Sequence, residues 1–260
     1  VPSFLADYLL SKRGNIVAKA SVSRNYRFPT LNDLYFLPGG NTDLKNESGF
    51  QYEAGLSFAV GKEGIYTLSG SASWYDQHID DWILWLPTAK GFFSPVNIKK
   101  VHAYGVEAQA DLAVVLAKEL KLGLNGTFSW APSINEGEPM SPADQSVGKQ
   151  LPYEPEFSAT VTGRLVYKSW GLLYQFCYYS QRYTMSSNDI TLTGSLTPYL
   201  MSNLSLEKGF AFRWADLSLK GTVNNLFNEE YQSVLSRPMP RLNYEIFLDI
   251  RPKWGKRNKK

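Results

Sequence analysis

Stretches of about ten residues in which apolar and polar positions alternate recur along the whole chain. In the clearest stretch every second residue is apolar or glycine: Phe157, Ala159, Val161, Gly163, Leu165 and Tyr167. The positions between them are mostly polar: Ser158, Thr160, Thr162, Arg164 and Val166. Segments 50–60 and 66–74 repeat the pattern. Successive side chains of a β-strand point to opposite faces, so each stretch predicts a strand with one face suited to lipid and the other to water.

The length of these stretches distinguishes two classes of β-protein. The strands of soluble β-sandwiches also alternate, so a soluble β-protein is the alternative interpretation. Spans near ten residues exceed the usual length of globular strands and favour strands that cross a membrane at a tilt. The sequence has no run of about 18 apolar residues, which excludes a transmembrane helix and leaves a closed barrel as the way to cross lipid. We therefore expect an all-β fold, a transmembrane antiparallel β-barrel.

Turn-like segments between the predicted strands are of two kinds. Five are short: 11–14, 61–64, 117–120, 168–171 and 208–213. Five are long and rich in Gly, Pro, Asn and Asp: 27–46, 86–99, 131–155, 184–197 and 225–240. Outer-membrane barrels have short periplasmic turns and long outer loops, so we expect the long segments on the cell surface.

The predicted strand count is odd. Five short turns join ten strands, and the alternating segment 242–250 adds an eleventh. A complete bacterial barrel has an even number of strands with both ends periplasmic. We therefore expect residues 1–260 to be the carboxy-terminal part of a larger barrel of about 22 strands. If residues 1–10 formed an extension rather than a strand, a ten-stranded barrel would result.

Composition and charge add little to this picture. Mean hydropathy is −0.27, as in many soluble proteins, because alternation averages out, but 16 Tyr, 14 Phe and 7 Trp are as expected for aromatic girdles at the membrane interfaces. The net charge is only +3, and the basic tail 256–260 is expected to be solvated, so we expect no nucleic-acid partner. Cys177 is the only cysteine, which excludes an intrachain disulfide.

Five segments resemble signatures of the TonB-dependent outer-membrane receptors, in the family's order. They are 23–35 (SRNYRFPTLNDLY), 41–56, 104–107 (YGVE), 151–155 (LPYEP) and 223–231 (VNNLFNEEY). Two features depart from the family: Pro240-Arg241 lacks the glycine usual before the last strand, and Trp254 is followed by six further residues.

The resemblance implies an outer-membrane receptor that binds a scarce nutrient for TonB-energised uptake. It also implies that the plug domain and the TonB-contacting box of such a receptor are absent from residues 1–260. Segments 79–83, 94–97 and 105–107 look like the cobalamin-receptor branch of Bacteroides-type bacteria, so cobalamin is the favoured ligand and an iron-siderophore the next. The implied partners are outer-membrane lipid, an amino-terminal barrel half with its plug domain, TonB acting through that plug, the small-molecule ligand and a surface lipoprotein. A non-specific porin-like channel and an outer-membrane enzyme are the alternatives.

Aromatic residues in the second long segment are the candidate ligand contacts. Trp82, Trp85, Phe92 and Phe93 could stack against a planar or apolar ligand. The alternative is that Trp82 and Trp85 belong to the aromatic girdle at the outer interface.

Asp76, His78 and Asp80 alternate along one predicted strand and could chelate a divalent cation, with calcium ordering an extracellular loop as the expected use. The alternative is a polar strand extension without a metal. His102 has no evident acidic partner in the sequence, and we expect it to be structural.

Five charged residues fall on predicted polar faces: Glu53, Glu107, Asp111, Arg164 and Lys220. Both signs occur, which favours contacts with a plug domain over an ion-selective pore. No nucleophile elbow, metal triad or phosphate loop is present in the sequence, so we expect no catalytic residues and no cofactor besides the structural calcium.

Overall fold

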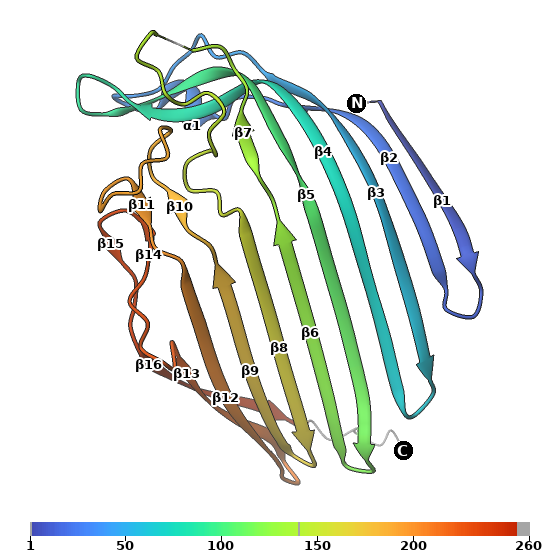
Figure 1. The fold of residues 1–260 in the computed structure, drawn as a ribbon. Coiled ribbons are helices and arrows are strands. Elements are labelled where there is room, and N and C mark those ends of the chain that lie inside the picture. The colour runs from blue at the N-terminus through green and yellow to red at the C-terminus, as the bar shows by residue number, and fades with distance from the viewer. Residues whose placement is uncertain (1, 140, 254–260) are drawn as a thin grey trace, which may run out of the picture.

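The computed structural model describes residues 2–139 and 141–253, and they form one long curved antiparallel sheet (Figure 1). Its eleven main strands, in spatial order, are β1 (Ser3–Ser11), β2 (Ile16–Arg27), β3 (Glu47–Lys62), β4 (Tyr66–Pro87), β5 (Phe93–Ala117), β6 (Leu120–Trp130), β8 (Phe157–Tyr167), β9 (Trp170–Tyr179), β12 (Tyr199–Ala211), β13 (Ala215–Asn224) and β16 (Asn243–Pro252). This confirms the all-β fold and the eleven predicted strands. Trp254 and the basic tail lie outside the described residues.

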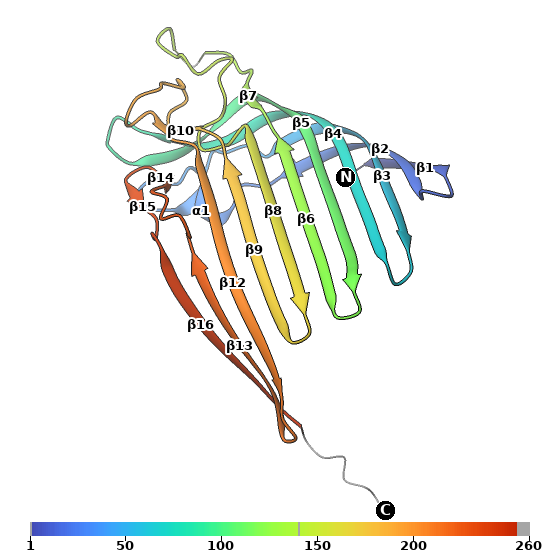
Figure 2. The ribbon, with the colours of Figure 1, turned by 60° about the horizontal axis from the view of Figure 1, so that its bottom comes forward.

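Each main strand pairs with the next main strand of the chain, so the wall is a meander (Figure 2). The ladder between β1 and β2 starts at Ser3 opposite Ser23, so the alternative in which residues 1–10 are not a strand is wrong. Within residues 2–139 and 141–253, β1 pairs only with β2 and β16 only with β13, which leaves the sheet open at both edges. None of the helices in this part of the chain is long and apolar enough to cross a membrane.

Short turns gather at one end of the sheet and longer connections at the other (Figure 1). Four of the five predicted short turns are confirmed, and two of them need only a pair of residues, 118–119 and 168–169, between strands. The turn predicted at 208–213 lies at 212–214 instead, because β12 continues to Ala211. The connections at the other end carry helix α1 (Leu31–Tyr35), strand β7 (Ser133–Asn135), which pairs with β5, and two small ribbons. These ribbons are β10 (Arg182–Tyr183) with β11 (Ser195–Leu196), and β14 (Gln232–Val234) with β15 (Arg237–Pro238).

One predicted long loop is wrong. Segment 86–99 is mostly strand, because β4 and β5 continue as a pair beyond the last residues that pair β3 with β4, Ser48 and Asp80, which mark the rim of the wall. This paired extension, the β4–β5 arm, ends with Pro87 opposite Phe93. Only residues 88–92 connect the two strands. The run Asp81-Trp82-Ile83-Leu84-Trp85 shows no alternation, because protein rather than lipid and water covers this part of the arm. Apolar and polar residues alternate along a strand only where one face of the strand lies in an apolar environment and the other in a polar one.

The ladder register sorts the side chains of the wall into two faces. Residues directly opposite each other on neighbouring strands share a face. Large apolar residues on one face are exposed, as expected for a lipid-facing surface: Phe50, Tyr52, Leu56, Phe58, Trp74, Phe157, Val161 and Tyr167. The opposite face carries Ser, Thr, Gln and charged residues, as expected for the lumen face of a membrane barrel. The predicted split between lipid and water is therefore the organising feature of this sheet.

Candidate functional site

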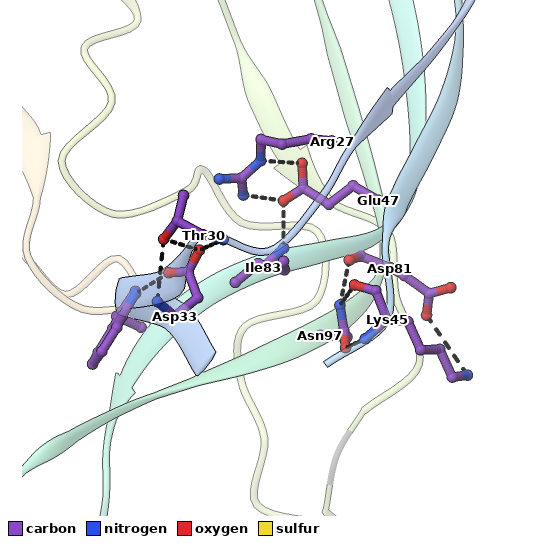
Figure 3. A network of polar contacts seen from close by, with 9 residues as sticks. Arg27, Thr30, Asp33, Lys45, Glu47, Asp81, Ile83 and Asn97 are labelled. Carbon is purple, nitrogen blue, oxygen red and sulfur yellow. Dashed lines mark hydrogen bonds and ion pairs between the residues drawn. The ribbon is translucent and has the colours of Figure 1, made fainter. Parts of the chain in front are cut away.

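Glu47 fixes the β4–β5 arm to the rim of the wall (Figure 3). Arg27 and Glu47 lie opposite each other at the end of the β2–β3 ladder, and the half-exposed guanidinium donates two hydrogen bonds to the buried carboxylate. The same carboxylate accepts a hydrogen bond from the backbone N–H of Ile83 at 2.7 Å. A buried amide and a cation therefore share one anion, which holds the base of the arm in place.

Asp33 joins helix α1 to the arm. Thr30 caps the helix, and its hydroxyl oxygen accepts the N–H of Asp33 at 3.1 Å while the Asp33 carboxylate accepts the N–H of Thr30 at 2.8 Å. This reciprocal capping box is encoded in the Thr-Leu-Asn-Asp sequence. The other carboxylate oxygen of Asp33 accepts the indole N–H of Trp85 at 2.9 Å.

The pKa of Asp33 reflects these contacts. Burial alone would raise it, but the hydrogen bonds from Thr30 and Trp85 and the charge of Arg27 outweigh burial and bring it below the ordinary 3.8. Asp33 is therefore ionised at neutral pH and accepts its hydrogen bonds as a carboxylate.

A third contact anchors the arm where β4 bends. Asp81 has a left-handed backbone (φ 56°), and its carbonyl accepts a hydrogen bond from the Asn97 amide at 2.6 Å. The Asn97 side chain also bonds both backbone groups of Lys45, at 2.9 and 3.2 Å (Figure 3). The long connection 28–46 therefore makes hydrogen bonds to both strands of the arm, through Asp33 to β4 and through Lys45 to β5.

Trp82 lies at the mouth of the lumen. Alternation alone would place it on the lipid face with Trp74, but after the bend at Asp81 it packs against Ile79 and Val101 of the opposite face. Leu151 completes this small core, and the Arg27 guanidinium lies 5.7 Å from the centre of the Trp82 ring. A cavity of about 230 Å³ adjoins the ring and is lined mostly by polar residues: Asn25, Arg27, Glu47, Gln77 and Ser48.

The four predicted ligand aromatics fall into two pairs. Trp82 and Trp85 belong to the packed base of the arm, where Trp85 also meets Phe36 edge-on with ring centres 5.8 Å apart. Phe92 and Phe93 lie at the tip, where Phe93 is 59% exposed. A side chain at Gly39 would meet the Phe93 carbonyl oxygen at 2.0 Å, so connection 28–46 approaches the tip as closely as a glycine allows.

A second candidate site was missed by the sequence reasoning. A cavity of about 730 Å³ opens between segments 190–197 and 230–236. Beside it, Tyr199 lies between Tyr179 and Tyr231, with ring centres 5.3 and 4.7 Å away. Burial raises the pKa of Tyr231, so its phenol is neutral at physiological pH. Only the tyrosine content of the strand ends hinted at this row, because its members are far apart in the sequence.

Arg182 closes this tyrosine row. It is buried, its guanidinium lies 5.1 Å from the centre of the Tyr199 ring, and one terminal nitrogen donates to the Gln232 carbonyl at 2.8 Å. Its Nε has no hydrogen-bond partner within residues 2–139 and 141–253. A buried cation with a free donor is a suitable partner for an anionic group of a ligand.

The register places all five predicted lumen charges on one face of the wall. Ladder partners link Glu53 to Tyr75, Glu107 to Ser73 and Ser129, Asp111 to Ser69 and Asn125, Arg164 to Gly123, and Lys220 to Glu207. Asp111 also accepts hydrogen bonds from the side chains of Gln109 and Asn125, at 2.9 and 2.6 Å. Their proposed contacts with a plug domain stay a prediction.

The predicted metal set is rearranged. Asp76 and His78 do meet, but the third member of the cluster is His102 of β5 rather than Asp80. The interpretation of His102 as a residue without an acidic partner is wrong, because its ring lies between Asp76 and Glu136. The ladder sets His102 opposite His78, a pairing that cannot be read until the register is known.

The chain is similar to a β-barrel family and to two vitamin B12 transporters. The family model described as TonB dependent receptor-like, beta-barrel matches residues 1–226. The chain is 27% identical over 226 residues to the vitamin B12 transporter BtuB of Photobacterium profundum, covering 84% of this chain and 33% of that protein. It is 33% identical over 92 residues to the vitamin B12 transporter BtuB of Vibrio vulnificus, covering 35% of this chain and 14% of that protein.

Solved structures share the fold. The copper transporter OprC has a TM-score of 0.70 at 17% identity, covering 94% of this chain and 38% of that one. The ferric citrate transporter FecA also has a TM-score of 0.70, at 13% identity, covering 97% of this chain and 38% of that one. The ferric enterobactin receptor PfeA of Pseudomonas aeruginosa, a G324V mutant, has a TM-score of 0.63 at 18% identity, covering 97% and 40%. This chain spans about a third of the length of the first curated relative.

Proposed function

The chain belongs to the TonB-dependent receptor β-barrel family of the bacterial outer membrane, and from that membership we propose that it forms wall strands and surface loops of a receptor for a scarce nutrient. The relatives are transporters and receptors, which confirms that the chain is not an enzyme. Uptake would be energised by TonB through a plug domain, against which the charged lumen face of the wall would pack.

Cobalamin is the ligand we propose. The observation that carries this proposal is the match of most of the chain to a vitamin B12 transporter. Cobalamin combines a large planar macrocycle with a phosphate, and the rim offers surfaces for both. Aromatic groups at the β4–β5 arm suit the macrocycle, and the buried Arg182 suits an anion.

An iron-siderophore is the second candidate, supported by the fold shared with ferric citrate and ferric enterobactin receptors. Such ligands are anionic, and many carry aromatic rings. The row of Tyr179, Tyr199 and Tyr231 with Arg182 matches those properties without requiring a macrocycle.

The test is a titration of the purified full-length receptor, in detergent, with cyanocobalamin and separately with ferric enterobactin and ferric citrate. Saturable binding of cyanocobalamin that excess siderophore does not displace supports the proposal. Saturable binding of a siderophore alone replaces cobalamin with the second candidate. Free diffusion of all three ligands through the reconstituted protein, without saturation, would identify a porin and overturn the receptor assignment.

A further inference from the structure

Asp76, His78 and His102 form a compact group on β4 and β5. The Asp76 carboxylate contacts an edge nitrogen of each imidazole, with one oxygen 3.1 Å from His78 Nε2 and the other 2.9 Å from His102 Nε2. The imidazole rings stack with centres 4.2 Å apart, and the three candidate ligand atoms all lie within 4.8 Å of one another.

The group lies on the same face of the wall as the exposed apolar side chains of Phe50, Tyr52 and Trp74. Phe50 is the ladder partner of His78, and Tyr52 is the ladder partner of Asp76. Both aromatic side chains are exposed. His102 packs on Tyr104, which in turn meets Trp130 edge-on. The group therefore faces outward rather than into the lumen, so a ligand bound there is separate from the transported nutrient.

From this geometry we propose that Asp76, His78 and His102 bind a single divalent late transition-metal ion, Zn²⁺ or Cu²⁺. Two imidazole nitrogens and a carboxylate oxygen are a donor set that such ions prefer. Ligand atoms that share a tetrahedral ion at about 2.1 Å lie about 3.4 Å apart. The two carboxylate–imidazole contacts, at 3.1 and 2.9 Å, would open by a few tenths of an ångström. Any wider separation in the group stays within 4.8 Å and would close by at most about 1.4 Å. The exposed ring of His78 can turn about its soft outer torsion to aim at the ion.

Glu136 supplies the orientation that such a site needs. Its carboxylate lies 3.2 Å from His102 Nδ1, and its backbone N–H donates to the Lys100 carbonyl of β5 at 3.0 Å. A hydrogen bond from Nδ1–H to Glu136 leaves the Nε2 lone pair of His102 free for the metal. This carboxylate-histidine-metal arrangement fixes the tautomer and raises the basicity of the ligand.

The donor set also replaces the calcium predicted from the sequence. Calcium favours six to eight oxygen ligands, whereas two of the three donors here are imidazoles. Asp80 lies further along β4 and is not a member of the group formed by Asp76, His78 and His102. A bound ion would join β4 to β5 directly and, through the contact of His102 with Glu136, to the segment after β7.

The experiment uses the full-length receptor, purified without a polyhistidine tag, stripped with chelator and titrated calorimetrically with Zn²⁺ and with Cu²⁺. We expect saturation by one ion, with affinity lowered more than about 100-fold in His78→Gln and His102→Gln and about 10- to 100-fold in Glu136→Gln. Asp80→Asn is the matched control and should bind like the unaltered receptor. Electron paramagnetic resonance of the Cu²⁺ form should show coupling to two imidazole nitrogens, and to one in His78→Gln.

Two results would overturn the proposal. One is the absence of saturable binding by the unaltered receptor. The other is binding that persists in the His78→Gln/His102→Gln double variant or that falls equally in Asp80→Asn. Should His102→Gln fail to assemble, His78→Gln decides the question, because His78 is 57% exposed and contributes little to packing.

Discussion

The buried carboxylate of Asp33 accepts three hydrogen bonds, two from Thr30 and one from Trp85, and is further stabilised by the nearby charge of Arg27. Asparagine offers only one acceptor oxygen, so Asp33→Asn cannot serve both Thr30 and Trp85. We expect the β4–β5 arm to lose about 2 kcal/mol of protection against local opening. Hydrogen-exchange mass spectrometry of peptides spanning 82–98 measures this, with the exposed Asp43→Asn as the control in the same connection.

The lowered pKa of Asp33 gives this contribution a defined pH dependence. A carboxyl group whose folded pKa is depressed stabilises the fold fully above its ordinary value, here 3.8. The contribution then declines as the pH falls below 3.8 and is lost once the pH passes the folded pKa. Arm protection in the unaltered receptor should therefore be constant from pH 7 to 5 and fall in stronger acid. An equal acid response in Asp33→Asn would assign the effect to other groups.

Trp82 is the predicted ligand residue that lies closest to the lumen mouth. We expect Trp82→Ala to weaken ligand binding by about tenfold, the loss that about 1.4 kcal/mol of aromatic contact represents. Trp74→Ala removes an exposed indole from the lipid-facing side of the wall and should leave the affinity for the ligand unchanged. Equilibrium titration of both variants, with assembly checked by heat-modifiable gel mobility, makes the comparison. Equal affinity in the two variants would remove Trp82 from the ligand site.

Among the elements, the β4–β5 arm depends most on a single junction, the Glu47 carboxylate. Glu47→Ala leaves the buried N–H of Ile83 without its acceptor and Arg27 without its anion, and we expect a local loss of about 3 kcal/mol. Glu119→Ala removes an exposed ion pair with Lys168 in the short turns and should cost less than about 1 kcal/mol. Hydrogen exchange at the base of the arm and in the turns compares the two. A small loss in Glu47→Ala would show that packing of Trp82 and Trp85 alone holds the arm.

The wall strands make an equally direct prediction about their two faces. Val161 lies near the middle of β8 on the lipid-facing side, and Thr162 is its neighbour on the lumen side. We expect Val161→Arg to destabilise the folded receptor by about 2–4 kcal/mol and Thr162→Arg to have little effect, since its neighbours include Asp111 across Asn125. Urea titration of refolding into lipid vesicles measures both. Reversal of the two effects would invert the assignment of the faces.

These elements also show what the sequence could and could not reveal. The wall strands were predictable to within a residue or two, because lipid on one side and water on the other impose a period of two on β8. The arm was not, since Trp82 to Leu86 meet protein and lack a period. The capping box of α1 can be recognised in the sequence from Thr30 and Asp33. The hydrogen bond from Trp85 to Asp33 cannot, because it joins residues 52 positions apart. The His78–His102 pair was hidden for the same reason, because only a known register brings it together.

At the scale of the whole molecule, the two edge strands of the sheet, β1 and β16, each have one side without a partner strand within the described residues 2–139 and 141–253. Lipid offers them no hydrogen bonds, and apolar residues such as Phe4, Tyr244 and Ile246 add exposed surface beside them. We expect residues 1–260 expressed alone to aggregate rather than insert, and the full-length receptor to assemble under the same conditions. Size-exclusion chromatography with light scattering in detergent tests this. A stable, monodisperse particle of one 29.3 kDa chain would contradict it.

The two ends of the wall differ in structure, and we expect them to differ in function. Two-residue turns at 118–119 and 168–169 hold neighbouring strands in register, whereas the other end carries the arm, the tyrosine row and both rim cavities. Changes in ligand preference should therefore map to the latter end and changes in assembly to the wall.

Because every main strand pairs with the next main strand of the chain, one hairpin can be gained or lost in evolution without changing the pairing of the others. Duplication or deletion of a gene segment that encodes one complete hairpin would widen or narrow the circumference by two strands. The direction of every remaining strand, and the side of the membrane from which every remaining loop emerges, would be unchanged. Barrels of different girth could thus arise from one ancestor without passing through an inverted intermediate.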